Sequence, residues 1–153
     1  MRYLYGLAIV FSIVLWSSCR KDFDTVPNTG NLEFSQDTIY LDTVFTNIGS
    51  STRTLKVYNR SSEDVNIPNI QLSQGESSSY RLNVDGIPGK TFENINVLAN
   101  DSIFVFIETT IDINNFPNPD NSFLYTDKIM FDSGTNSQEV DLVTLVQDAI
   151  FLF

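Results

Sequence analysis

The sequence predicts an all-β fold, in the form of an antiparallel sandwich of about seven to nine strands. From Asn31 onward, apolar and β-branched residues recur in short runs bounded by Asn, Asp, Gly, Ser and Pro, as in strands joined by turns. No stretch after Asn31 shows the period of an amphipathic helix. Many short strands without helices are typical of a sandwich. The predicted strands are residues 31–34, 38–45, 54–59, 65–72, 80–84, 92–97, 102–111, 128–131 and 139–146.

Alternation along these strands predicts which side chains face the core. In the run TLKVYN, Leu55 and Val57 point to one side, and Lys56 and Tyr58 point to the other. This period of two is typical of a strand that is buried on one face. We therefore expect Leu55 and Val57 in the core.

The run SIFVFIETTI is apolar on both faces. One face carries Ile103, Val105 and Ile107, and the opposite face carries Phe104 and Phe106. A strand with two apolar faces is typically central and covered on both sides. We expect a loop or a neighbouring domain to cover its second face.

Residues 1–18 have the layout of a secretory signal peptide. Arg2 precedes the apolar run from Leu7 to Trp16, which ends at the small residues Ser17 and Ser18. A permanent membrane-spanning helix needs about 20 apolar residues, and this stretch is shorter. We therefore expect residues 1–18 to be removed.

Cys19 is the chain's single cysteine, so an internal disulfide is excluded. The charged residues Arg20, Lys21 and Asp22 follow it, and burying them beside a free thiol would be costly. The segment SSC resembles the lipobox of bacterial lipoprotein signal peptides. The resemblance implies that Cys19 carries acyl chains and anchors a Gram-negative protein in the outer membrane, on its periplasmic or its surface-exposed face.

The remaining sequence divides into a tether and one domain. Residues 19–31 hold the lipidated cysteine and a polar stretch with Pro27 and Gly30, which reads as a flexible tether. Residues 32–153 have the length of one domain. The formal net charge of −10 excludes non-specific nucleic-acid binding, because the phosphate backbone is itself anionic.

The predicted domain resembles immunoglobulin-like domains of the abnormal-spindle/Hydin kind in bacterial surface proteins. The resemblance lies in the strand that ends at Asn59, in the spaced Ile67 and Ile70, and in the turn NDS at 100–102 before the longest strand. It implies an immunoglobulin-like sandwich and no catalytic residues. The chain also resembles the N-terminal region of longer uncharacterised outer-membrane lipoproteins.

The apolar end of the chain, residues 150–153, fits that second resemblance. An apolar run of this kind usually marks a contact. Either these residues cover an open face of the domain, or a C-terminal domain is missing from this chain. The second interpretation is favoured.

The sequence predicts a non-enzyme without a cofactor. There is no histidine, so Ser-His-Asp and Cys-His nucleophiles are excluded. No glycine pair has the spacing of a phosphate-binding loop. Glu108 is the best single carboxylate candidate, since it closes an apolar strand, but alternation favours a solvent-facing side chain.

Residues 112–122 contain candidate ligands for a calcium ion. This stretch gathers oxygen-bearing side chains that suit Ca²⁺, including Asp112 and Asp120. It lacks the EF-hand pattern, and Asn, Asp and Pro also dominate ordinary turns. We expect a turn and no metal.

Four Asp-Thr or Asp-Ser steps resemble the acceptor triplet for O-glycosylation in some Gram-negative bacteria. The hydroxyl groups concerned are those of Thr25, Thr38, Thr43 and Ser102. The simpler interpretation is that Asp-Thr opens strands through turn chemistry.

Three functions remain open. The first is a lipid-anchored, non-catalytic spacer, adhesion or protein-interaction module of the cell envelope. The second is a glycan-binding lipoprotein of a polysaccharide-uptake system, for which the stacking candidates are Tyr40, Tyr58, Tyr80, Phe116 and Tyr125. The third is the non-catalytic N-terminal part of a longer lipoprotein enzyme.

Overall fold

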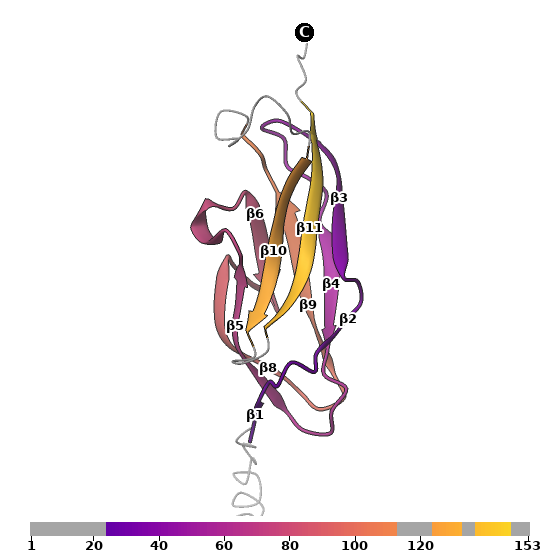
Figure 1. Cartoon of the computed structure of the whole chain (residues 1–153), viewed down its shortest axis with the longest axis vertical. Helices are drawn as coiled ribbons and strands as arrows, with labels where there is room; N and C mark the ends of the chain where they lie inside the picture. The colour runs from indigo at the N-terminus through magenta and orange to yellow at the C-terminus, as the bar shows by residue number, and fades with distance from the viewer. Residues whose placement is uncertain (1–23, 113–123, 133–136, 148–153) are drawn as a thin grey trace, which may run out of the picture.

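The computed structural model describes residues 24–112, 124–132 and 137–147, and these fold into two packed β-sheets (Figure 1). The strands are β1 (Val26–Pro27), β2 (Glu33–Phe34), β3 (Thr38–Phe45), β4 (Arg53–Tyr58), β5 (Val65–Leu72), β6 (Tyr80–Val84), β7 (Ile87–Gly89), β8 (Thr91–Val97), β9 (Ser102–Thr109), β10 (Leu124–Asp132) and β11 (Gln138–Gln147). A three-residue 3₁₀ turn, η1 (Gly75–Ser77), follows β5.

Each sheet has its own strand order. In the six-stranded sheet, β5, β10, β11 and β3 lie side by side, and β1 and β8 both pair with β5. The five-stranded sheet has the order β2, β4, β9, β6, β7. The predicted all-β class is therefore confirmed, and the fold is an immunoglobulin-like sandwich.

The predicted strand bounds are close to those observed. The predictions for 38–45, 65–72 and 80–84 coincide with β3, β5 and β6. The run predicted as 128–131 is longer, because β10 begins at Leu124. The short strands β1 and β7 were not predicted, since two or three residues carry no periodic pattern.

Two strand pairs of the sandwich are parallel, and the other strand pairs are antiparallel, as predicted. β3 runs parallel to β11, and β1 runs parallel to β5. Parallel neighbours need a long connection between them, and nearly the whole domain separates β3 from β11 in sequence. The β3–β11 register also shifts between Thr144 and Val146.

The described part of the predicted tether belongs to the sandwich. Val26 pairs with Val65, and the Asn28 amide donates to the carbonyl of Asn66 at 2.8 Å. Leu32 is buried, and its backbone exchanges two hydrogen bonds with the Gln138 side chain. The domain therefore begins by Val26, earlier than residue 32.

The core follows the alternation of the strands. Leu55 and Val57 are fully buried, as predicted, while Lys56 and Tyr58 face outward and are half-buried. The other large side chains with almost no exposure come from both sheets, which places the core between them. They include Ile39, Ile67, Ile70, Leu72, Tyr80, Ile107, Ile111, Ile129, Phe131 and Leu142.

Asn59 organises one end of the sandwich. Its side-chain amide donates to the carbonyls of Glu63, Val97 and Leu98, and its Oδ1 accepts from the backbone and hydroxyl of Ser61. Asn59 is buried, so these bonds satisfy backbone groups that water does not reach. The loop after β4 is thereby joined to the loop before β9.

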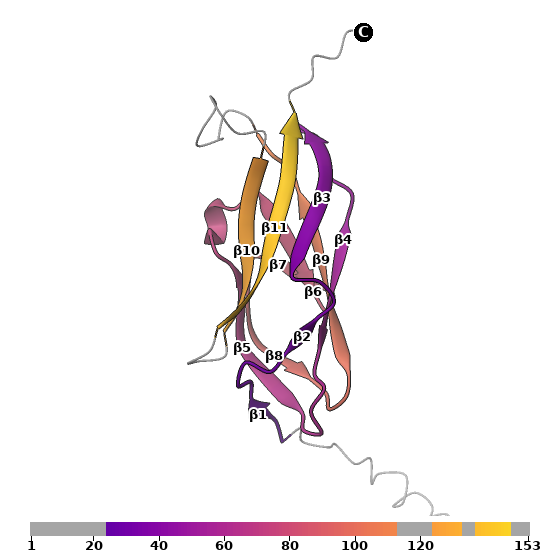
Figure 2. The same cartoon turned by 45° about the vertical axis from the view of Figure 1, so that its right-hand side comes forward.

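The described chain starts and finishes at opposite ends of the long axis. β1 lies at the lower end in both views, and the last residues of β11 lie at the upper end (Figures 1 and 2). If the chain is attached through its N-terminal side, the end of the sandwich at which β11 finishes therefore lies far from the attachment point.

Candidate functional site

The outer side of the five-stranded sheet carries a row of aromatic and cationic side chains. We call it the aromatic face, and it consists of Lys56, Tyr58, Arg60, Phe104 and Phe106. Strands β4 and β9 are antiparallel neighbours, and their register places Lys56 opposite Phe104. Alternation directs these side chains outward, because Leu55, Val57, Ile103 and Val105 take the inner positions.

Cations lie over the rings of this face. Lys56 Nζ is 4.9 Å from the centroid of the Phe104 ring and 5.5 Å from that of Tyr58. The Arg60 guanidinium lies 4.3 Å from the Tyr58 centroid and is paired with Glu33 at 3.1 Å. Contacts of this type are attractive, because the cation meets the negative face of the ring quadrupole.

Two phenylalanine rings remain open to solvent on the same face. The rings of Phe104 and Phe106 are stacked with centroids 6.2 Å apart, and their residues are 42% and 39% exposed. The prediction that β9 is a central strand is confirmed. No described residue provides the cover that was predicted for its second face.

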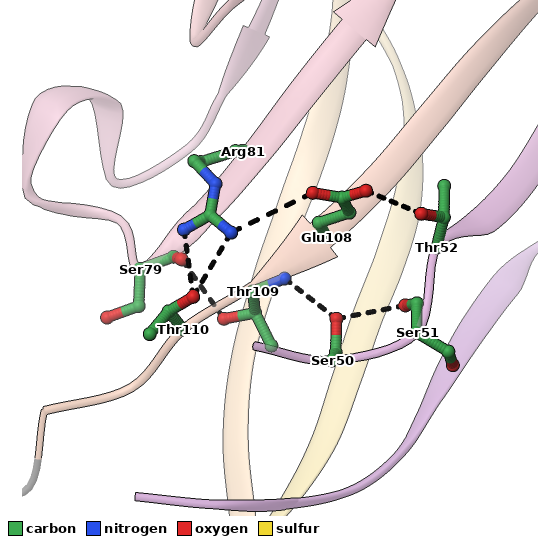
Figure 3. A network of polar contacts seen from close by, with 8 residues as sticks. All are labelled: Ser50, Ser51, Thr52, Ser79, Arg81, Glu108, Thr109 and Thr110. Atoms are coloured by element: carbon green, nitrogen blue, oxygen red, sulfur yellow. Dashed lines mark hydrogen bonds and ion pairs between the residues drawn. The ribbon is translucent and has the colours of Figure 1, made fainter. Parts of the chain in front are cut away.

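A polar network lies at one end of the aromatic face (Figure 3). Both terminal nitrogens of Arg81 donate to the Thr110 hydroxyl at 3.1 Å, and one of them lies 3.8 Å from a carboxylate oxygen of Glu108. The Thr52 hydroxyl donates to the other oxygen of Glu108. Beside it, the Thr109 amide donates to Ser50 Oγ at 2.9 Å. The network joins β6 and β9 to the segment before β4.

Glu108 therefore matches its predicted solvent-facing position. Its side chain is 46% exposed and engaged with Arg81 and Thr52. A shallow hollow of 320 Å³ lies beside it, lined also by Asn83, Pro88 and Phe106. An exposed carboxylate paired with a cation is an ordinary surface feature, and we assign Glu108 no catalytic role.

The predicted stacking aromatics separate into surface and core residues. Tyr40 is 67% exposed and Tyr58 is half-buried, so both reach the surface. The prediction is wrong for Tyr80 and Tyr125, which are buried and stacked on each other with ring centroids 5.2 Å apart. Both point inward because they occupy inward positions of β6 and β10. Phe116 lies outside the described residues.

The hydroxyl groups predicted as glycan acceptors differ in exposure. Thr43 is exposed on β3, whereas Thr25, Thr38 and Ser102 are half-buried. Their modification stays a prediction.

Several other predictions fall outside the described residues. Cys19, residues 113–122 of the candidate calcium loop and residues 150–153 all lie there. Within the described ranges, no group of three acidic, histidine or cysteine side chains is placed to hold a metal ion. The same ranges contain no helix that is long and apolar enough to cross a membrane.

Comparison with known proteins finds similarity to solved structures at low sequence identity. No protein-family model matches the chain, and no curated protein matches it in sequence. Among solved structures, it is similar to a family 123 glycoside hydrolase from Clostridium perfringens, with 15% identity and a TM-score of 0.50. It is also similar to a protein of unknown function from Porphyromonas gingivalis W83, with 12% identity and a TM-score of 0.50.

The coverage of these matches limits what they show. The alignment with the hydrolase covers 74% of this chain and 23% of that one, and the alignment with the P. gingivalis protein covers 79% and 50%. The ASH / PapD-like domain 7 of human CEP192 aligns over 88% of this chain and 96% of its own, at 16% identity and a TM-score of 0.47. At such identities the likeness concerns the fold alone.

Proposed function

We propose that this protein is a lipid-anchored, non-catalytic interaction module of the bacterial cell envelope, which docks a protein partner on the aromatic face. The observation that carries the proposal is the solvent-exposed pair Phe104 and Phe106 on the central strand of the five-stranded sheet. Large apolar side chains that are held outward in a group usually mark an interaction surface.

The chemistry of the aromatic face suits a partner with both apolar and acidic groups. Aromatic rings are typical anchors of protein interfaces, where they fill pockets at low entropic cost. Lys56 lies against the rings of Phe104 and Tyr58, so an acidic group of the partner would meet a positioned cation. Lys56 thus offers a positive charge on a chain whose formal net charge is −10.

The position of β1 supports the anchored arrangement. If Cys19 is lipidated, six residues separate it from Val26, and six extended residues span about 20 Å at most. The sandwich would then stand close to the bilayer with its long axis leading away from β1 (Figure 2). The aromatic face lies on the side of the sandwich, where it is accessible to a neighbour in the same membrane.

The anchor is tested by Cys19→Ala in cells. We expect the variant to leave the membrane fraction and to stay folded, because covalent lipid supplies the attachment and strand pairing within the described residues begins at Val26. Fractionation with metabolic palmitate labelling measures both effects. Persistence of the variant in the membrane fraction would contradict the anchor and would indicate that residues 7–16 are retained.

The docking surface is tested by photo-crosslinking in the same cells. A photoreactive amino acid at Thr54, which lies opposite Phe106, should give a protein adduct of defined mass. The same group at Glu139, on the other sheet, serves as the matched control. Adding Phe104→Ser and Phe106→Ser should abolish the adduct from position 54. Equal adducts from both positions, or none from position 54, would overturn the assignment.

A glycan ligand is the second candidate, and it is favoured by one observation. Tyr40 is the most exposed of the large apolar side chains that the structure describes, and it borders a hollow on the six-stranded sheet. Exposed aromatic rings that border a polar hollow can stack on the apolar face of a sugar ring. This candidate uses the opposite side of the molecule from the protein-docking proposal.

A further inference from the structure

We propose that the hollow beside Tyr40 is a binding site for a neutral carbohydrate, an inference that rests on the second candidate function. The hollow has a volume of 470 Å³ and lies on the outer side of the six-stranded sheet. We call it the Tyr40 hollow. Its lining includes Thr38, Tyr40, Gln74, Thr126, Lys128 and Asp141. Small-molecule sites usually have volumes of about 300–1,000 Å³.

Three neighbouring strands bring the lining together. Val143 of β11 pairs with Tyr40 of β3 on one side and with Thr126 of β10 on the other. In the next row, Asp141 pairs with Thr38 and with Lys128. The site therefore rests on paired backbone, so its side chains are held at fixed spacing.

Tyr40 supplies the apolar contact. Its neighbours Ile39 and Leu41 are buried, so alternation fixes Tyr40 outward, and the residue is 67% exposed. A sugar ring has an apolar face of C–H groups, which packs against an aromatic ring. Holding a solvent-exposed aromatic ring on a rigid strand lowers the entropy lost when the ligand binds.

The polar groups of the hollow match the hydroxyl groups of a sugar. Thr38 and Thr126 carry hydroxyls, and the Asp141 carboxylate is an acceptor. Lys128 Nζ lies 2.5 Å from a Glu139 oxygen and 3.6 Å from an Asp141 oxygen. Its hydrogen bond to Glu139 raises the pKa of Lys128, so this donor stays charged.

The wall of the hollow is also fixed in place. Gln74 Nε2 donates to the Thr126 carbonyl at 2.7 Å, and the Ser73 amide donates to the Lys128 carbonyl at 2.8 Å. The segment after β5 is thereby held against β10. A preformed wall of this kind is typical of small-ligand sites.

Charge selects against an anionic glycan. Glu139 and Asp141 already neutralise Lys128, and the formal net charge of the chain is −10. An acidic polysaccharide would meet repulsion both at the site and from the whole molecule. A neutral sugar avoids this cost and can donate a hydrogen bond to the Asp141 carboxylate, which lines the hollow.

Binding is tested with the full chain in detergent micelles. The probes are immobilised neutral oligosaccharides of glucose, galactose, mannose and xylose, with polygalacturonate as the anionic comparison. We expect binding to at least one neutral probe. Tyr40→Ala should weaken this binding about tenfold or more, as expected for an anchoring aromatic residue. Tyr40→Phe keeps the ring and should change the affinity by less than about threefold.

Two further variants distinguish a specific loss of binding from a general loss of folding. Ile87→Ala removes an exposed apolar side chain from the other sheet and should leave binding unchanged. Thr126→Arg keeps Tyr40 but fills the hollow, and it should abolish binding. If the wild type binds no neutral probe, both the site and the glycan candidate are overturned. If the wild type binds a neutral probe and binding survives both Tyr40→Ala and Thr126→Arg, glycan binding stands and this site is wrong.

Discussion

Two stacked aromatic pairs lie in opposite environments of the same sandwich. Tyr80 and Tyr125 lie in the core with ring centroids 5.2 Å apart, and Phe104 and Phe106 lie on the surface with centroids 6.2 Å apart. Hydrophobicity alone would place the phenylalanines inside and the tyrosines outside. The reversal separates side chains that hold the two sheets together from side chains that are exposed to solvent.

The buried tyrosines are stable there because their hydroxyl groups are paired. Tyr80 comes from the five-stranded sheet, and its hydroxyl reaches the Tyr125 carbonyl at 3.0 Å and the Thr144 hydroxyl at 2.8 Å in the six-stranded sheet. The Tyr125 hydroxyl accepts the Ser79 amide at 2.9 Å. Buried polar groups that are paired in this way join the sheets without an unsatisfied group.

The largest expected effect is that of Tyr80→Ala. The change removes a fully buried ring and both of its hydrogen bonds across the sheets. We expect the free energy of unfolding to fall by about 3–5 kcal/mol, as for other large aromatic residues truncated in cores. Urea unfolding followed by circular dichroism measures the change. A loss below about 1 kcal/mol would show that the stacked tyrosines do not hold the sheets together.

Tyr80→Phe should have a smaller effect that isolates the hydroxyl group. The ring stays, but Thr144 Oγ1 and the Tyr125 carbonyl each lose a partner in the core, which costs about 1–3 kcal/mol. Adding Thr144→Val removes one stranded hydroxyl and should recover part of the loss. If the double variant is less stable than the sum of the single changes predicts, the pair does not act through this hydrogen bond.

Tyr80→Phe should also change the stability of the fold at alkaline pH. Burial raises the pKa of Tyr80 well above its ordinary value of about 10. The folded protein therefore keeps the Tyr80 proton at pH values at which the unfolded chain has lost it. The contribution of Tyr80 to the free energy of unfolding is thus complete below pH 10 and falls as the pH rises further. In Tyr80→Phe the decline of stability above pH 10 should be shallower, as measured by urea unfolding across that range. An unchanged slope would mean that Tyr80 titrates normally.

The sequence alone predicted the features that depend on residues close together along the chain. Alternation placed Leu55 and Val57 inside and predicted the two apolar faces of β9, and turn residues bounded β3, β5 and β6 correctly. The same alternation puts Tyr80 on the inner side with Leu82 and Val84, which are both buried. Treating tyrosine as a surface residue overrode that pattern and gave the wrong environment.

The features that were not predicted depend on contacts between segments that are distant in the sequence. Nothing within β3 indicates that it pairs in parallel with β11, nor within residues 26–27 that they pair with β5. Tyr125 lies in a part of β10 where no strand was predicted. The aromatic face and the Tyr40 hollow likewise require strand register, since Lys56 meets Phe104 and Tyr40 meets Val143 only through pairing between strands.

The smallest expected effect on stability is that of Phe104→Ala. Phe104 is 42% exposed and its ring lies 4.9 Å from the Lys56 ammonium, so removing the ring should lower the free energy of unfolding by about 0.5–1 kcal/mol. This is a fraction of the loss expected for Tyr80→Ala, although both changes truncate one ring of a stacked pair. Urea unfolding of the two variants under one set of conditions gives the ratio directly.

The ratio of these two stability losses distinguishes an aromatic pair that serves recognition from one that serves folding. If Phe104→Ala costs little stability but removes the photo-crosslinked adduct at position 54, the exposed pair serves recognition and the buried pair serves folding. If Phe104→Ala instead costs as much as Tyr80→Ala, the ring is covered by part of the same chain. The exposed face would then be a second core layer, and the partner surface would have to lie elsewhere on the sandwich.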